Sequence, residues 1–162
     1  MPFTPLHMGP GLLIKAPMQG AFSLMVFGWT QILIDIQPLV VLLTGHGALH
    51  GISHTYLGAT PIALLAALSG KYAGEFGLRV LRRPEFLPIG WRTAFASAFI
   101  GAYSHVAIDG IMHADMSPLW PFATARMLYG IIPVETLHLL CLASALLGIA
   151  GYCLVRRWRH AR

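Results

Sequence analysis

The chain has 162 residues, of which 56% are hydrophobic and only 10% are charged, and its mean hydropathy is +0.67. Soluble domains carry about 25% charged residues. The composition therefore excludes an ordinary soluble domain and predicts an integral membrane protein. The formal net charge is +5, but the basic residues lie between apolar segments and at the end of the last one, so we expect no nucleic-acid partner.

Five apolar segments predict an all-α fold, in which residues 1–162 form one membrane-embedded helical domain. The first runs from about residue 5 to 16, with Thr4 as the expected N-cap and Pro5 at the first helical position. No Lys or Arg precedes Lys15, so a secretory signal peptide is not expected. A helix of about 12 residues is about 18 Å long, which is short for a hydrocarbon core of about 30 Å. We expect a half-helix or a tilted helix.

The remaining four segments are expected to be full spans of a polytopic bundle. The second runs over about 21–36 and is expected to stop at Pro38, after which residues 39–47 are apolar but interrupted. The third covers about 52–69 with a kink at Pro61, and a basic connection follows at 71–92. The fourth covers about 91–113. The fifth, about 135–158, contains the apolar run TLHLLCLASALLGIAGYCLV, which has the roughly 20 residues that a crossing helix needs.

The basic residues indicate an orientation. If the segments alternate, ten of the eleven Lys and Arg residues fall on one side of the membrane, and only Arg126 lies on the other. Cytoplasmic loops carry an excess of Lys and Arg. We therefore expect a multi-pass protein of the inner (plasma) membrane with a cytoplasmic C-terminus.

Most ionisable residues of the apolar segments fall on the opposite, outer half. An ionisable group at mid-bilayer costs about 3 kcal/mol or more, so each is a functional hypothesis. His105, Asp109 and His113 follow one another at intervals of four and can share one helix face. Further candidates in this half are His7, Asp35, His46, His50, His54, Asp115, Glu135 and His138.

Some of these residues also have a purely structural explanation. His46 lies in the loop-like TGHG, and Asp115 could cap a turn. Glu135 with His138 could simply begin a helix, and His105 with Asp109 could form a buried hydrogen-bonded pair. Whether His46, Asp115, Glu135 and His138 belong to a site is left open.

Mixed His and carboxylate groups at helical spacing favour a divalent metal, zinc first, with manganese or iron as alternatives. Two or more ions would need a shared carboxylate, for which Asp109 is the candidate. Asp35 is expected to be either a ligand or the general base. The predicted ligands are His7, Asp35, His50, His54, His105, Asp109, His113 and His138.

Four short motifs occur in order: LIDIQP at 33–38, HGISHT at 50–55, SHVAID at 104–109 and LWP at 119–121, in a chain that begins MPFT. This ordered set resembles the inner-membrane metal-dependent hydrolases, which include the LexA-binding, inner membrane-associated hydrolases. The resemblance implies a metal-dependent hydrolase.

That family is in turn distantly similar to the zinc-dependent phospholipase C and P1 nuclease group, all-helical enzymes with a three-zinc cluster. The similarity implies ligand positions at His7, Asp35, His54, His105 and Asp109. Two positions depart from the pattern. Gly51 stands where an Arg usually follows the first His of the third motif, and Gln37 replaces the second acidic residue of the second motif.

The favoured function is hydrolysis of a lipid-like phosphoester by a metal-activated water, because a site at this depth is reached from the bilayer. A haem-binding electron carrier with two axial His ligands is one alternative. A metal-ion or proton transporter is another, since such proteins also contain His and Asp chains. A non-catalytic interaction protein with the same fold is a third.

Overall fold

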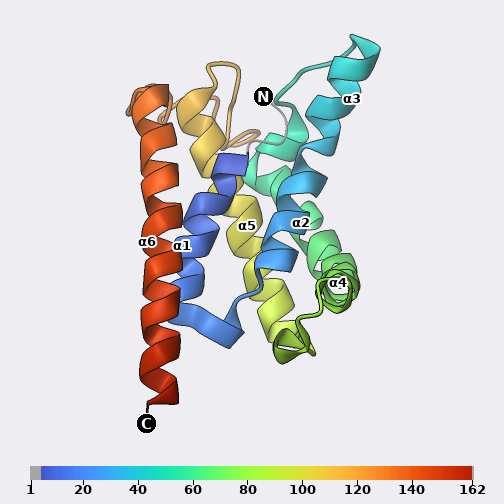
Figure 1. Ribbon diagram of the computed structural model, residues 1–162. Coiled ribbons are helices and arrows are strands. Elements are labelled where there is room, and N and C mark those ends of the chain that lie inside the picture. Colours follow the sequence, from blue (N-terminus) through green and yellow to red (C-terminus); the bar gives the residue numbers. More distant parts are fainter. Residues whose placement is uncertain (1–4, 162) are drawn as a thin grey trace.

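The computed structural model describes residues 5–161, and within this range the chain forms helices and turns without a β-strand. The α-helices are α1 Met8–Met18, α2 Leu24–Ile34, α3 Ile36–Thr44, α4 Tyr56–Val80, α5 Trp91–Met112 and α6 Val134–His160 (Figure 1). Short 3-10 helices lie at the joints: η1 Pro5–His7, η2 Gln19–Ala21, η3 Ile52–His54 and η4 Pro84–Phe86. The all-α class is confirmed, whereas Thr4, the expected N-cap, lies outside the described residues.

Among the described residues, three helical stretches are long and apolar enough to cross a membrane. They are Leu24–Thr44, which joins α2 and α3, Trp91–Met112, and Val134–Arg159. These apolar helices fit association with a membrane. The expectation of four full spans is not confirmed, because the third apolar segment, expected over 52–69, is not among them.

The second apolar segment continues further than predicted. α2 begins after Ser23, whose hydroxyl accepts a hydrogen bond from the Val26 N–H, and the chain passes through Asp35 directly into α3. The expected stop at Pro38 was wrong. Pro38 occupies the first turn of α3, where its missing N–H costs no helical hydrogen bond. The helix ends instead at Gly45, which adopts a left-handed conformation with φ of 71°.

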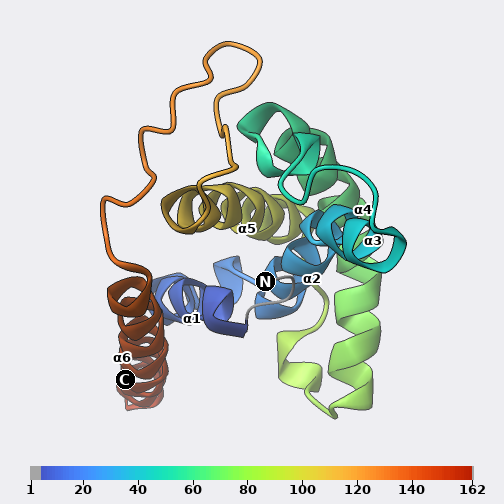
Figure 2. The ribbon, with the colours of Figure 1, turned by 90° about the horizontal axis from the view of Figure 1, so that it is seen from above.

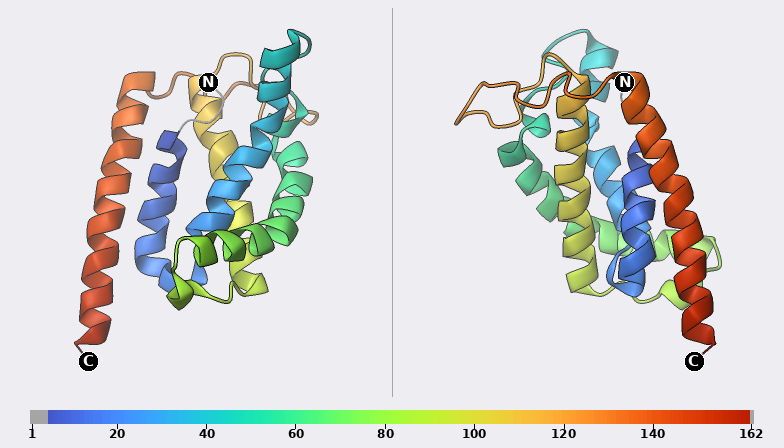
Figure 3. Two further views of the ribbon diagram at one scale, coloured as in Figure 1. Left: turned by 45° about the vertical axis from the view of Figure 1, so that its right-hand side comes forward. Right: turned by 90° about the vertical axis from the view of Figure 1, so that its left-hand side faces the viewer.

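The third segment is also longer than predicted and differs in direction. Thr55 caps α4 by accepting a hydrogen bond from the Gly58 N–H, and the helix continues for 25 residues. It therefore includes part of the stretch 71–92, which the sequence indicated as a connection. Figures 2 and 3 show that α4 crosses the bundle obliquely, so its last turns lie across the lower part of the upright helices.

Small residues bring the helices close together. α1 packs along α6, and α2, α4 and α5 pack on one another. A Cβ atom at Gly9 would clash with the backbone carbonyl of Cys141, and one at Gly148 would clash with the backbone of Leu12. The short first segment is thus a helix laid against the long last one, which agrees with the expected half-helix.

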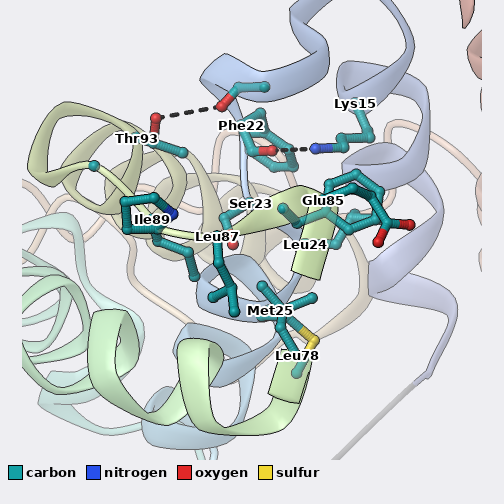
Figure 4. Close-up of a pocket in the computed structure, with 14 residues that line it drawn as sticks. Lys15, Phe22, Ser23, Leu24, Met25, Leu78, Glu85, Leu87, Ile89 and Thr93 are labelled. Carbon is teal, nitrogen blue, oxygen red and sulfur yellow. Dashed lines mark hydrogen bonds between the residues drawn. The ribbon is translucent and has the colours of Figure 1, made fainter. Parts of the chain in front are cut away.

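Two buried charged residues hold the turns at the lower end of the bundle. Lys15 Nζ donates hydrogen bonds of 2.6 Å to the carbonyl oxygens of Gln19 and Phe22, which closes the turn between α1 and α2. Figure 4 shows the bond to Phe22. Glu75 of α4 accepts hydrogen bonds from Lys71 Nζ and, at 3.1 Å, from the Ile89 N–H. The Lys71 ammonium and this N–H together hold the pKa of Glu75 below its ordinary value, although burial raises it.

We predict that Glu75→Gln lowers the free energy of unfolding by about 1–2 kcal/mol at pH 7, because charged hydrogen bonds to Lys71 and Ile89 are weakened. A carboxyl group with a lowered pKa stabilises the fold above its ordinary pKa of 4.5 and loses this contribution as the pH falls. The difference in melting temperature between parent and variant should therefore shrink below pH 4.5. Glu85→Gln, at an exposed residue paired with Arg83, is the control and should change little. Equal losses in both variants would contradict this role for Glu75.

Candidate metal centre

Two helices and a 3-10 turn bring four buried side chains to one point in the upper half of the bundle. Asp35 comes from the junction of α2 and α3, His54 from η3, and His105 and Asp109 from successive turns of α5. Each offers one nitrogen or oxygen atom, and these atoms all lie within 4.8 Å of one another. Segments far apart in the sequence thus form a single group of two imidazoles and two carboxylates.

The spacing inside this group is that of metal ligands. His105 Nε2 lies 3.4 Å from Asp35 Oδ1 and 3.2 Å from Asp109 Oδ2, and His54 Nε2 lies 3.6 Å from each of the same two oxygens. Bonds of about 2.0–2.1 Å to a tetrahedral ion separate neighbouring ligand atoms by about 3.3–3.4 Å. Both Nε2 atoms are buried, and neither has a hydrogen-bond partner among the described residues. Such atoms are costly unless something else binds them.

Partners on the outer nitrogens orient the two imidazoles. His105 Nδ1 lies 2.7 Å from Gln31 Oε1, and the Gln31 amide nitrogen donates to the Gly101 carbonyl at 3.1 Å. The amide oxygen therefore accepts from Nδ1–H, which leaves the lone pair of Nε2 facing the carboxylates. The hydroxyl of Ser53 lies 2.8 Å from His54 Nδ1 and can serve in the same way. Such outer partners are typical of metal-binding histidines.

A second group of possible ligands adjoins the first through Asp109. It consists of His50, Asp109 and His113, whose ligand atoms also lie within 4.8 Å of one another. The rings of His50 and His113 are stacked with centroids 4.1 Å apart, and His113 Nε2 is 4.0 Å from Asp109 Oδ1. His50 Nδ1 donates to the carboxylate of Asp115 at 2.9 Å, so its Nε2 is free to act as a ligand.

His7 lies beside the same carboxylate oxygen. Its Nε2 atom is 3.2 Å from Asp109 Oδ1, and it is buried with no hydrogen-bond partner in the described part of the chain. One oxygen of Asp109 thus faces His7 and His113, while the other faces His54 and His105. A carboxylate in this position can bridge two ions.

Two histidines outside the apolar spans, His54 and His113, favour their neutral form. Burial lowers the pKa of His54, and burial together with the charge of His50 lowers the pKa of His113. Burial raises the pKa of Asp115, but the hydrogen bond from His50 and the charges of His50 and His113 together hold it below the ordinary value. Neutral imidazole and ionised carboxylate are the forms that bind metal.

The two groups contain six of the eight predicted ligands, His7 lies beside them against Asp109, and His138 is left out. His138 lies on α6 and belongs to neither group, although its Nε2 is buried without a hydrogen-bond partner among the described residues. His46 and Glu135 are exposed and also belong to neither group. Asp115 supports His50 rather than joining the ligand atoms.

His50 and His54, although four residues apart, do not share a helix face, because α4 begins only at Tyr56 and both residues precede it. The fourth segment was expected over about 91–113; α5 ends at Met112, and His113 follows it. Gln31 was not among the predicted residues. Gln31 precedes Asp35 by four residues and so lies on the same helix face. This spacing could have indicated that Gln31 lies near the site.

A buried group of His and Asp side chains that could hold a metal ion is therefore part of this fold. Comparison of the chain with models of protein families, with curated proteins and with solved structures finds no match.

We predict that His105→Ala lowers the metal content of the purified protein by at least half, because it removes one ligand atom of the four-residue group. His46→Ala is the matched control, since His46 is exposed and outside both groups. Elemental analysis of the purified variants measures the metal per chain. Equal metal content in the two variants would contradict the assignment of His105.

Proposed function

We propose that this protein is a membrane-embedded, metal-dependent hydrolase that cleaves a phosphoester bond in a lipid-like substrate. The observation that carries the proposal is Asp109, a buried carboxylate whose two oxygens face different sets of histidines. The donor set of imidazole and carboxylate suits zinc, with manganese or iron as alternatives. Bound ions would lower the pKa of a coordinated water toward 7 and stabilise charge on the phosphoryl group.

The residues of the centre would have three roles. His54, His105, Asp35 and Asp109 would hold the first ion, and His50, Asp109 and His113, with His7 beside Asp109, would hold the second. Gln31, Ser53 and Asp115 keep the imidazoles in the tautomer that directs Nε2 inward. Asp35 lies 3.4 and 3.6 Å from the two histidines of its group, which favours a ligand role over that of a free general base.

The arrangement supports hydrolysis better than the two rival chemistries. A porphyrin between any two of these histidines would need space that the carboxylates occupy at 3.2–3.6 Å from Nε2. A transporter needs a chain of polar groups through the bundle. Below the centre, the buried groups Thr30, Ser97 and Lys15 are bonded to the backbone: Thr30 to the Val26 carbonyl, Ser97 to the Ser23 N–H, and Lys15 to the Gln19 and Phe22 carbonyls. These bonds favour a structural role for the three side chains over a transport path.

The proposed substrate class follows from the position of the centre relative to the charged ends of the bundle. The turn at 81–90 and the C-terminal end of α6, which carry many of the basic residues, lie at the lower end in Figure 1. We place that end in the cytoplasm, as the positive-inside rule favours. The centre then lies in the outer half of the bundle, where a lipid of the outer leaflet could reach it.

We predict that purified protein hydrolyses a chromogenic phosphodiester, that a chelator abolishes this activity, and that zinc or manganese restores it. Since burial lowers the pKa of His54 and His113, the rate should hold at pH 7 and fall only below the ordinary histidine pKa of 6.5, as the ligands become protonated. Asp35→Asn should lower kcat/KM by on the order of 100-fold, while His46→Ala should not. Full metal content without cleavage of any lipid or soluble phosphoester would remove the enzyme proposal and keep the binding site.

We predict that a reporter fused after Arg162 is found in the cytoplasm and that one inserted near Thr124 is found outside. Paired alkaline phosphatase and fluorescent protein fusions at each position measure this. The two positions lie beyond opposite ends of α6, so a correct bundle gives opposite signals. The inverted result would place the histidines on the cytoplasmic side and contradict the proposed outer-leaflet substrate.

A further inference from the structure

An apolar groove of about 590 Å³ lies between α1, α2 and α4, beneath the metal centre. Its walls include Met8 of α1, Met25, Gly28 and Ile32 of α2, and Ala73 and Phe76 of α4. None of the described residues that line it is charged. The indole nitrogen of Trp29, which also lines the groove, donates to the Ser69 hydroxyl at 2.9 Å, so the ring presents apolar surface. The groove is therefore suited to a hydrocarbon occupant.

The upper end of this groove meets the metal centre. Gln31 lines the groove and also accepts the hydrogen bond from His105 Nδ1. On α2, Gly28, Ile32 and Asp35 follow at intervals of four and three residues, so the groove and the Asp35 carboxylate lie along one helix face. Met8 directly follows His7 in the chain. One side chain thus separates the apolar surface from the ligand atoms.

The groove has the length and direction of a lipid chain. From Leu24 to Ile32 it follows α2 for eight residues, or about 12 Å, which is close to the roughly 15 Å depth of one leaflet. Its open side carries Ile32, which is 43% exposed, and Phe76, which is 67% exposed. A phospholipid with its phosphate at the centre would direct an acyl chain down this path, from Gln31 toward the last turns of α4.

We propose that this groove binds one acyl chain of the substrate, a phospholipid, and so positions its phosphoester at the metal centre. This inference depends on the proposed function for its substrate class. Unbranched methionine side chains at Met8 and Met25 can adjust to a flexible chain. Met8 packs against Gly28, where an added Cβ would lie 3.4 Å from Met8 Sδ, so a larger residue at 28 would narrow the groove.

The test is photo-cross-linking with a phosphatidylethanolamine that carries a diazirine in one acyl chain, followed by peptide mass spectrometry. In the unaltered, metal-loaded protein we expect labelling to be enriched at least fivefold on α2 between Leu24 and Ile32 over the exposed faces of α6. Ala73→Phe should fill the groove and reduce that labelling by at least fivefold. Ala143→Phe, an equal enlargement at an exposed position of α6, should leave it unchanged.

The outcomes separate this inference from the hydrolase proposal, because cross-linking needs no turnover. Labelling spread evenly over the lipid-facing helices of the unaltered protein would overturn the groove assignment, even if the enzyme is active. Labelling that persists in Ala73→Phe, with parental metal content as evidence of folding, would also overturn it. A labelled groove in a protein that cleaves no phosphoester would support lipid binding and contradict only the hydrolase proposal.

Discussion

The structure depends on the position of one buried carboxylate in an apolar bundle. Asp109 is 4% exposed, on a helix long and apolar enough to cross a membrane. A charge in such a place is tolerated only when it is paired or coordinated. The chain meets this condition by directing His7, His54 and His105 toward it, each of which comes from a different segment. The η1 and η3 turns, which deliver two of these histidines, are therefore as much part of the centre as the long helix.

Close helix packing makes this convergence possible. Alanines at 59, 63 and 102 are fully buried beside Ile34 and Val106, and they let α2, α4 and α5 approach one another just below the ligands. Larger side chains there would move the elements apart and lengthen the ligand spacing of 3.2–3.6 Å. Lipid tails are as apolar as helix side chains, so helices in a membrane gain no hydrophobic energy by associating. Close packing of small residues is then a main source of their association.

The class of fold and most residues of the two ligand groups could be predicted from the sequence. Both depend on local signals, namely the energetic cost of an ionisable residue in an apolar segment and the periodicity of a helix. An ionisable residue in an apolar run is easily recognised. His105 and Asp109 are four residues apart, and helix geometry alone places them on one face. The path of α4 could not be predicted in this way, since its oblique crossing depends on contacts with α2 and α5. The turn between His50 and His54 is irregular, so its sequence has no periodic pattern from which its conformation could be predicted. His138 was predicted as a ligand but belongs to neither group. Its position in an apolar segment does not tell which face of α6 is turned toward the centre.

Gln31 touches both the apolar groove and the imidazole of His105, and this double contact has a thermodynamic consequence. A ligand that fixes the Gln31 side chain also fixes His105, and a metal that fixes His105 constrains Gln31. The two binding equilibria are then coupled, and linkage requires each occupant to change the affinity for the other by the same factor. Metal retention by this protein would accordingly vary with the lipid or detergent that surrounds it, through a reciprocal cooperativity located in one amide side chain.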